Sequence, residues 1–299
     1  MTYSFATTYN VSTEDIVMLI SAMFIFGTIG IFRRMIPLPS AWIAFFRGVV
    51  GAIFLYLFVK IKGKKFAHHL QGKTLVLLVI TGALIGIDWM MLFEAYNYTS
   101  VSVATLCYYM EPTFVVILSC IVFRERMTVK KTICTLLALA GMVLISGITE
   151  SGGLQSGDVK GILLGIGAAI IYAVVVILNK SLPGIDAYEK TMIQLGSASL
   201  IMIPYLLLSG VPEKNSWNLS VVALLLVVGV VHTGISYTLY FGSMDHLKTQ
   251  TVALFSYVDP VVALLLSVCI LHEKMSVIGI LGAILILGSA VFCELGKDS

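Results

Sequence analysis

The chain has 299 residues, of which 59% are hydrophobic and 12% charged, and its mean hydropathy is +1.00. Soluble domains carry about 25% charged residues, so this composition excludes a soluble domain and indicates an integral membrane protein. The formal net charge of +3 is too small to point to nucleic-acid binding.

Long apolar stretches indicate transmembrane helices and not a β-barrel. Barrel strands alternate apolar and polar residues, whereas stretches such as TLVLLVITGALIGI and VVALLLVVGVVHTGI do not. A spanning helix needs roughly 20 apolar residues, so the length accommodates ten spans with short loops. We therefore predict an all-α integral membrane protein whose ten helices cover residues 15–33, 39–59, 74–95, 100–123, 129–147, 159–179, 187–209, 219–241, 249–271 and 277–294.

The start of the chain and its basic residues predict the orientation of these spans. The sequence MTYSFATTYNVSTED has no Lys or Arg and no small-residue cleavage site, so we expect the first span to be retained. With the N-terminus inside, the inside loops carry 13 basic residues and the outside loops 5, mostly because of the first half of the chain. Basic residues accumulate in cytoplasmic loops. We expect both termini to be cytoplasmic, in a cell membrane of the bacterial inner or plasma type.

The five cysteines all lie in apolar spans, and none forms a CxxC pair. Small apolar packing is the usual role of such cysteines. We therefore expect no metal and no cofactor.

The two halves of the chain resemble each other. Shifting the sequence by 148 residues lays YMEPTFVVILSCIVFRERMTV over YVDPVVALLLSVCILHEKMSV, so that Glu111 meets Asp259 and Pro112 meets Pro260. Five spans is an odd number, so the two copies must have opposite orientations in the membrane. Inverted repeats recur in secondary transporters, with the binding site near the midplane. We predict repeats at residues 1–147 and 159–299, joined by a polar linker at 148–158.

The two copies resemble the drug/metabolite transporter superfamily, in particular its ten-helix EamA-type members. Each copy has an acidic residue before Pro, an apolar run, and then Glu followed by Arg or Lys and by a hydroxyl residue before the next helix. FEAYNYTSVSVATL and FGSMDHLKTQTVAL, which precede the two copies, add to the resemblance, and it covers nearly the whole chain. One departure is Asp259 where the first copy has Glu111, which leaves open whether the two acids share one role.

The resemblance implies secondary transport by alternating access, often export driven by protons or by substrate exchange. It also implies a central cavity lined by the first, third, fourth, sixth, eighth and ninth spans. It does not imply an enzyme.

Glu111 and Asp259 are the first candidate site residues. Glu111 lies about 12 residues into its span, which is roughly 18 Å and therefore near the midplane, and Asp259 lies at a similar depth. Ionisable groups within a bilayer usually face the bundle interior or a wet cavity. A carboxylate held between desolvation and a nearby positive charge can exchange a proton near neutral pH. The alternative is that each carboxylate is fixed by backbone donors freed where Pro112 or Pro260 breaks the helix.

Further candidates lie in the third and eighth spans. Asp88 aligns with Ser236 in the repeat, and His232, Ser236, Tyr240 and Ser243 form a polar stripe that we expect to face a wet or polar surface. The His232 side chain is suited to proton transfer. The alternative for these residues is structural hydrogen bonding between helices.

Arg47 is the clear basic residue deep within a span. It is a candidate for substrate binding, and the alternative is an ion pair with Glu111 or Asp88. Aromatic residues form a second theme, because rings beside carboxylates suit ammonium groups. The aromatic candidates are Trp89, Tyr108, Tyr240 and Tyr257, and ordinary packing is the alternative reading.

Other polar residues are better explained as structure. Glu125 and Glu273 end the two apolar runs, and Thr128 and Ser276 stand where the N-cap of the following helix belongs. For Gln194 we expect a hydrogen bond between helices.

The deep charges decide the predicted substrate. Three acids face one base, Arg47, which favours proton-coupled transport of a small cationic or zwitterionic metabolite such as an amino acid or an amine. The alternative within transport is an exchanger of nucleotide sugars or sugar phosphates, which would need more than one deep base. Outside transport, a membrane receptor or enzyme remains, although the sequence has no HExxH, GxSxG or Cys/His cluster. The predicted partners are a small-molecule substrate, protons as the coupling ion and the lipid bilayer; a homodimer stays open, and nucleic acid is not expected.

Overall fold

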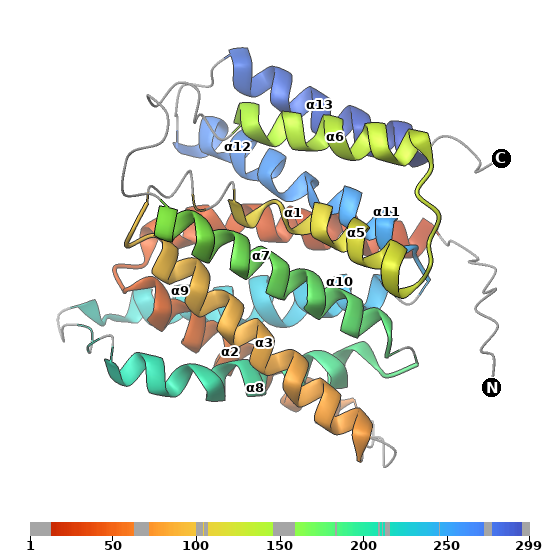
Figure 1. The fold of residues 1–299 in the computed structure, drawn as a ribbon. Coiled ribbons are helices and arrows are strands. Elements are labelled where there is room, and N and C mark those ends of the chain that lie inside the picture. The colour runs from red at the N-terminus through yellow and green to blue at the C-terminus, as the bar shows by residue number, and fades with distance from the viewer. Residues whose placement is uncertain are drawn as a thin grey trace.

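The computed structural model is helical throughout the part of the chain that it describes. That part comprises residues 13–62, 72–99, 104, 107–145, 159–182, 184–208, 210, 212, 216–244, 246–271 and 277–294, and it contains no β-strand. The helices pack into one bundle, in which α6 and α13 lie side by side at the edge (Figure 1).

The helices of the first half are α1 (Thr13–Met35), α2 (Ser40–Ile61), α3 (Lys73–Ala95), α5 (Glu111–Val122) and α6 (Val129–Ile145). The second half contains α7 (Val159–Lys180), α8 (Ala187–Leu208), α9 (Leu219–Gly229), the π-helix η2 (Val230–Ile235), α10 (Ser236–Ser243), α11 (Thr249–Ser256), α12 (Val258–Leu271) and α13 (Val277–Glu294). Every predicted span therefore contains helix, but three of the spans are divided into shorter elements.

Several helices have the length and composition of membrane spans. Within the described ranges, six are long and apolar enough to cross a bilayer, and they cover Thr13–Phe32, Ser40–Ile61, Lys73–Ala95, Val159–Lys180, Ala187–Leu208 and Leu219–Ser243. Their outward-facing side chains are apolar; Leu163 is 64% exposed and Leu200 68%. Such a surface is costly in water but suits hydrocarbon, where helices satisfy their own backbone polar groups.

Both carboxylate–Pro pairs lie at the start of a helix, not within a continuous one. Helix α5 begins at Glu111 with Pro112 in its first turn, after a turn at residues 109–110. Helix α12 begins at Val258, after a turn at residue 257, with Asp259 in its first turn. Proline is tolerated there because the first N–H groups of a helix have no intrahelical partner. The predicted spans 100–123 and 249–271 are thus each interrupted beside their proline.

The span predicted at 219–241 is also interrupted, by the π-helix η2. Glycine on both sides of the contact lets α2 approach this segment closely. A Cβ atom added to Gly51 would lie 3.0 Å from the carbonyl oxygen of Gly229 and 3.3 Å from the backbone nitrogen of Gly234. Small residues allow such backbone contacts between membrane helices. A hydropathy pattern does not distinguish a π turn from an α turn, and the sequence-based prediction missed it.

The helix contacts are repeated between the two halves. Helix α3 packs on α7 and α8; in the matching positions of the other half, the segment from α9 to α10 packs on α1 and α2. Helix α1 packs on α12, and its match α7 packs on α5. The pairs α2–α8 and α6–α13 each join two matching elements. Exchanging the halves therefore leaves this pattern of neighbours unchanged.

The first and last helices have ends at the same end of the bundle. Asp15, at the start of α1, lies 3.3 Å from Nδ1 of His246, just before α11. The first turn of α11 is bound by Glu125, just before α6. Lys130, at the start of α6, lies 5.2 Å from the ring centroid of Phe292 near the end of α13. These contacts place the start of α1 and the end of α13 at one end.

Candidate functional site

Asp88 is a fully buried carboxylate on α3. Its exposed fraction is 0%, and the Tyr108 hydroxyl donates to its Oδ2 at 3.5 Å. Its Oδ1 has no hydrogen-bond partner among the described residues. Glu111 and Arg47 both act on Asp88 electrostatically. The structure therefore brings together one residue from each of α2, α3 and α5 that the sequence singled out.

Arg47 stacks on an aromatic ring. Its guanidinium carbon lies 4.1 Å from the ring centroid of Trp89. Its Nε is buried without a hydrogen-bond partner in the described part of the chain. Arg47 also acts electrostatically on Asp88. A cation over a tryptophan face is attracted by the ring quadrupole, so Trp89 positions Arg47 beside Asp88.

Glu111 and Asp259 interact although they lie in different halves of the sequence. Glu111 is 7% exposed, and its Oε1 has no partner among the described residues. Asp259 acts on it electrostatically. Asp259 itself interacts with the Tyr109 side chain. Each acid lies in the first turn of its helix, where the helix dipole favours negative charge.

Hydroxyl pairs connect the elements that carry these two acids. The Tyr257 hydroxyl and Thr113 Oγ1 are 2.8 Å apart, which joins the turn before α12 to α5. The Tyr240 hydroxyl lies 3.4 Å from Ser256 Oγ, which joins α10 to α11. Tyr257 is 1% exposed and Tyr240 2%. Both predicted tyrosines are thus buried beside the segments that begin at Glu111 and Asp259.

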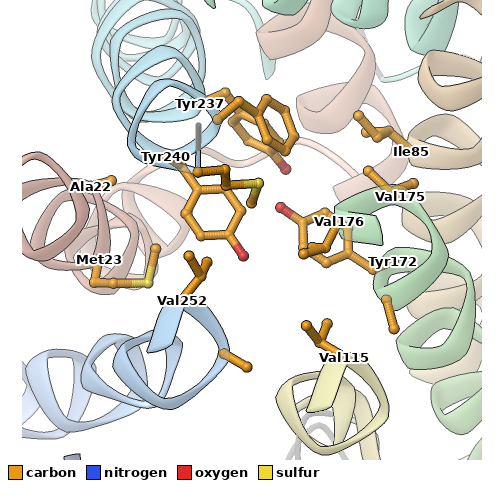
Figure 2. Packing of buried hydrophobic residues seen from close by; sticks show 14 of the residues in the cluster. Ala22, Met23, Ile85, Val115, Tyr172, Val175, Val176, Tyr237, Tyr240 and Val252 are labelled. Carbon is orange, nitrogen blue, oxygen red and sulfur yellow. The ribbon is translucent and has the colours of Figure 1, made fainter. Parts of the chain in front are cut away.

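Tyrosine side chains from two helices converge beside the acids. Figure 2 shows the hydroxyl groups of Tyr172, Tyr237 and Tyr240 pointing toward a common centre between α7 and α10. The Tyr237 ring lies edge-on to Trp89, with ring centroids 6.3 Å apart, and the Tyr108 and Tyr172 centroids are also 6.3 Å apart. Our sequence reasoning missed Tyr172. Its signal was a lone hydroxyl within the apolar run GIGAAIIYAVVVIL.

The polar stripe of the eighth predicted span is buried and largely satisfied by its own helix. Ser236 Oγ donates to the carbonyl of His232 at 2.6 Å, and Ser243 Oγ donates to the carbonyl of Tyr240 at 2.8 Å. Serine often bonds its own helix backbone in this way. Both serines thus have acceptors within their own helix, and the wet or polar surface expected for the stripe stays a prediction. His232 contacts α1 instead, with Nε2 2.8 Å from Thr28 Oγ1.

A hollow in the surface of the described residues lies away from the acids. It is lined by Gly72, Lys73, Val76 and Leu77 at the start of α3. Asp88 follows Lys73 by 15 positions, or about 22 Å along the helix. The central cavity implied by the resemblance stays a prediction.

Glu125 binds a different helix. Its two carboxylate oxygens accept hydrogen bonds from the backbone N–H groups of Thr249 and Gln250, at 3.2 and 3.4 Å. The preceding residue, Arg124, has a φ of +54°, a left-handed conformation that turns the chain at the end of α5. The expectation that Glu125 is structural is confirmed, but it caps α11 and does not only form its own turn.

Two further structural expectations are confirmed. Thr128 Oγ1 accepts from the backbone N–H of Lys131 at 3.3 Å, as an N-cap does. Gln194 Nε2 donates to Asn179 Oδ1 at 3.0 Å and so joins α8 to α7. Glu273 and Ser276 lie outside the described residues.

Comparison with known proteins shows the family. The model of the EamA-like transporter family matches residues 14–147 and, separately, residues 159–294. A Bacillus subtilis protein named "Uncharacterized transporter YxxF" is 30% identical over 255 residues, covering 85% of this chain and 81% of its own length. Protein RarD of Salmonella typhimurium is 23% identical over 206 residues, covering 67% of this chain and 66% of its own.

A solved crystal structure shares the fold. It superposes with a TM-score of 0.81 at 20% identity, covering 94% of this chain and 96% of its own. The family match, the named relatives and the apolar helices together make this a multi-pass membrane protein. The chain belongs to the EamA-like transporter family.

Proposed function

We propose that the protein is a proton-coupled secondary active transporter, an exporter or exchanger, of a small cationic or zwitterionic metabolite such as an amino acid or an amine. One observation carries the proposal: the acids Asp88, Glu111 and Asp259 interact within one region, in which Arg47 is the base that acts on Asp88 among the described residues. Charges inside a membrane protein are expensive and mark ion or substrate paths.

The unpartnered polar atoms support a substrate with an ammonium group. Oδ1 of Asp88 and Oε1 of Glu111 are buried acceptors without donors among the described residues. An ammonium group would supply those donors, and the rings of Trp89 and Tyr237 beside it would add cation–π attraction. The Nε of Arg47 is buried without a hydrogen-bond partner among the described residues, so this guanidinium N–H is available to bind the carboxylate of a zwitterion.

The proximity of Glu111 and Asp259 supports proton coupling. Two carboxylates in one desolvated region repel each other, so the region favours a bound proton or a bound cation. A substrate cation and a proton would then compete for the same acids. Such competition couples the movement of one to the counter-movement of the other.

The packing supports alternating access between two inverted repeats. The pattern of helix neighbours is unchanged when the halves are exchanged, and the family model matches each half separately. We propose ten spans in two inverted five-helix repeats, residues 1–147 and 159–299, joined by 148–158. The two carboxylate helices α5 and α11–α12 would meet at the interface between the repeats, where secondary transporters of this design bind their substrates.

The proposal is tested by uptake into proteoliposomes under an imposed pH gradient. The labelled probes are putrescine, lysine, choline and glucose 6-phosphate. We expect the gradient to drive uptake of at least one of the first three and not of the sugar phosphate. Preferential uptake of glucose 6-phosphate would favour the sugar-phosphate exchanger, and no uptake or exchange of any solute class would favour a receptor or enzyme.

The role of Glu111 is tested in the same vesicles. Glu111→Gln removes the charge and the exchangeable proton but keeps the side-chain volume, so we expect the stimulation by the gradient to fall at least tenfold. Glu14→Gln is the matched control, because Glu14 is exposed at the start of α1, and it should keep the wild-type stimulation. Unchanged stimulation in Glu111→Gln would remove this residue from the proton path.

A further inference from the structure

The π-helix η2 holds a buried histidine whose two ring nitrogens have different surroundings. His232 is 2% exposed and packs edge-on against Phe32, with ring centroids 4.6 Å apart. Its Nε2 lies 2.8 Å from Thr28 Oγ1, whereas its Nδ1 has no hydrogen-bond partner among the described residues. This arrangement lies outside the group of acids described above.

The hydrogen bonds of Thr28 determine which nitrogen carries the proton. The Thr28 hydroxyl donates to the carbonyl of Ile25 at 2.7 Å. A hydroxyl has one proton to donate, so toward His232 it can act only as an acceptor. With Thr28 donating to Ile25, these two hydrogen bonds assign Nε2 of His232 as the N–H that donates to Thr28. In the neutral ring, the lone pair is then on Nδ1.

The lone pair on Nδ1 is a vacant proton-binding position. The backbone of Val227 also interacts with the ring, and its carbonyl could accept a hydrogen bond from a proton added at Nδ1. Proton binding would thus add a hydrogen bond there without breaking the one between Nε2 and Thr28. Histidine is the side chain whose charge changes in the physiological pH range.

The charged and titratable groups near the ring come from the helices around η2. Arg47 on α2 acts on His232 electrostatically. From α1 the ring meets Thr28 and Phe32, and the Arg33 and Arg34 side chains lie outside the description. Helix α9 has no titratable side chain, and α10 offers Tyr237 and Tyr240.

We propose that Nδ1 of His232 binds and releases a proton during transport, and that Thr28 is the positioning residue that keeps this nitrogen free. The protonation itself stands on the geometry alone, and its part in transport rests on the proposed function. A charged His232 would repel the Arg47 guanidinium, which is stacked on Trp89 beside Asp88. Proton uptake on η2 would therefore weaken the hold of Arg47 near the acids and connect the α1–η2 contact to the substrate region.

Nitrogen-15 NMR of the ring tests the tautomer without any substrate. The full chain is labelled at histidine, with His68, His69, His246 and His272 replaced by Gln so that His232 alone gives a signal. At high pH we expect Nε2 to be of the N–H type and Nδ1 to carry the lone pair. Between about pH 9 and about pH 5, Nδ1 should gain a proton. An N–H at Nδ1 in the neutral ring, or no change over this range, would overturn the proposal.

Thr28→Val tests the positioning role in the same sample. Valine keeps the shape of the side chain but removes the acceptor. We expect the neutral ring to lose its single tautomer and to show a mixture of both. A ring that keeps the wild-type tautomer in Thr28→Val would show that Thr28 does not fix it.

Putrescine uptake links the titration to transport. His232→Gln places an amide N–H near the position of Nε2 but cannot titrate, so the part of the pH profile that follows the ring should disappear. His246→Gln is the control, because His246 is an exposed histidine with a side chain 66% accessible, and it should keep the wild-type profile. Loss of coupling in Glu111→Gln together with a wild-type profile in His232→Gln would defeat the His232 proposal alone. A titrating ring in a protein without proton coupling would instead defeat the proposed function.

Discussion

At the residue scale, hydroxyl groups hold the segments that carry the buried acids. Tyr257 and Thr113 join the start of α12 to α5 through an oxygen–oxygen distance of 2.8 Å. Tyr108 donates to Asp88. A hydroxyl binds a neighbour without adding charge to a region that already contains three acids. Tyrosine and threonine therefore bind near the acids without changing the charge of the region.

The Tyr257–Thr113 pair gives an asymmetric mutational prediction. Thr113→Val leaves the Tyr257 hydroxyl buried without a partner, at a cost of about 1–3 kcal/mol. Tyr257→Phe costs less, about 1 kcal/mol, because the Thr113 hydroxyl can bond its own helix backbone. Thermal unfolding in detergent measures which variant loses more stability. A larger loss of stability in Tyr257→Phe than in Thr113→Val would contradict the prediction.

The acids could be predicted from the sequence, whereas their partners could not. Asp88, Glu111 and Asp259 stand out because a charge in an apolar span is costly wherever it lies. Tyr172 and Thr28 carry no such cost, and only the packing of α7 and α1 against other helices gives them their partners. Arg47 shows the same limit, since its depth was evident but its position over Trp89 depends on how α2 meets α3.

At the element scale, several short helices begin at or beside a carboxylate. Pro112 and Pro260 each lie in the first turn of a helix that begins beside them. Helix α11 is capped in a similar way by Glu125, a carboxylate from the other half of the chain. Helix N-termini thus bind carboxylates at several places in this bundle, consistent with the direction of the helix dipole.

Removing the Glu125 cap should loosen the contact between α5 and α11. Glu125→Ala leaves two backbone N–H groups of α11 without this acceptor, at a cost of about 0.5–2 kcal/mol. Cys120 reports on the contact, because Gln250 Nε2 lies 3.4 Å from its Sγ. With the other four cysteines replaced by Ser, maleimide labelling of Cys120 should be several times faster in Glu125→Ala. Glu125→Gln keeps an acceptor, so its labelling rate should lie between those of the wild-type contact and of Glu125→Ala. Equal labelling rates in these three proteins would show that the cap does not hold α5 and α11 together.

The α3–α8 contact depends on the absence of a side chain at Gly82. A Cβ atom there would lie 2.4 Å from the carbonyl oxygen and 2.7 Å from the Cα of Gln194. Backbone atoms cannot yield as side chains do, so Gly82→Ala should cost about 1–3 kcal/mol. Gly196 on α8 has nothing within 4 Å of its Cβ position, so Gly196→Ala should be neutral or stabilising by about 0.5–1 kcal/mol. The melting temperatures of Gly82→Ala and Gly196→Ala measure this difference. Equal losses of stability in the two variants would show that the α3–α8 contact adjusts to the added methyl group.

The limits of the helices were more predictable than their internal breaks. Apolar length determines where a span starts and ends, so the predicted ends of the first three spans agree with α1, α2 and α3 within a few residues. The π-helix Val230–Ile235 depends on a close approach to Gly51 from a distant part of the chain. No pattern local to residues 230–235 contains that information.

At the scale of the whole molecule, the shared end of α1 and α13 agrees with the prediction of two termini on one side. The distribution of basic residues predicts that this side faces the cytoplasm. Cysteines introduced at the exposed Lys62 and Lys160 should then report opposite sides. An impermeant maleimide should label Lys62→Cys only in inverted vesicles and Lys160→Cys only in intact cells. The reverse pattern would invert the topology.

The π-helix makes the two halves unequal. Residues 82–87 correspond to η2 under the 148-residue shift, yet they lie within the α-helix α3. In the proposed cycle, the halves exchange conformations, so α3 would have to adopt the wider turn where Gly82 and Gly86 touch the α8 backbone. Breaking that contact costs free energy. The unloaded carrier should therefore rest in the orientation seen here, and its empty return should be the slowest step. Exchange of one solute for another across the membrane would then be faster than net transport. The solute concentration on the opposite side of the membrane would therefore set the transport rate.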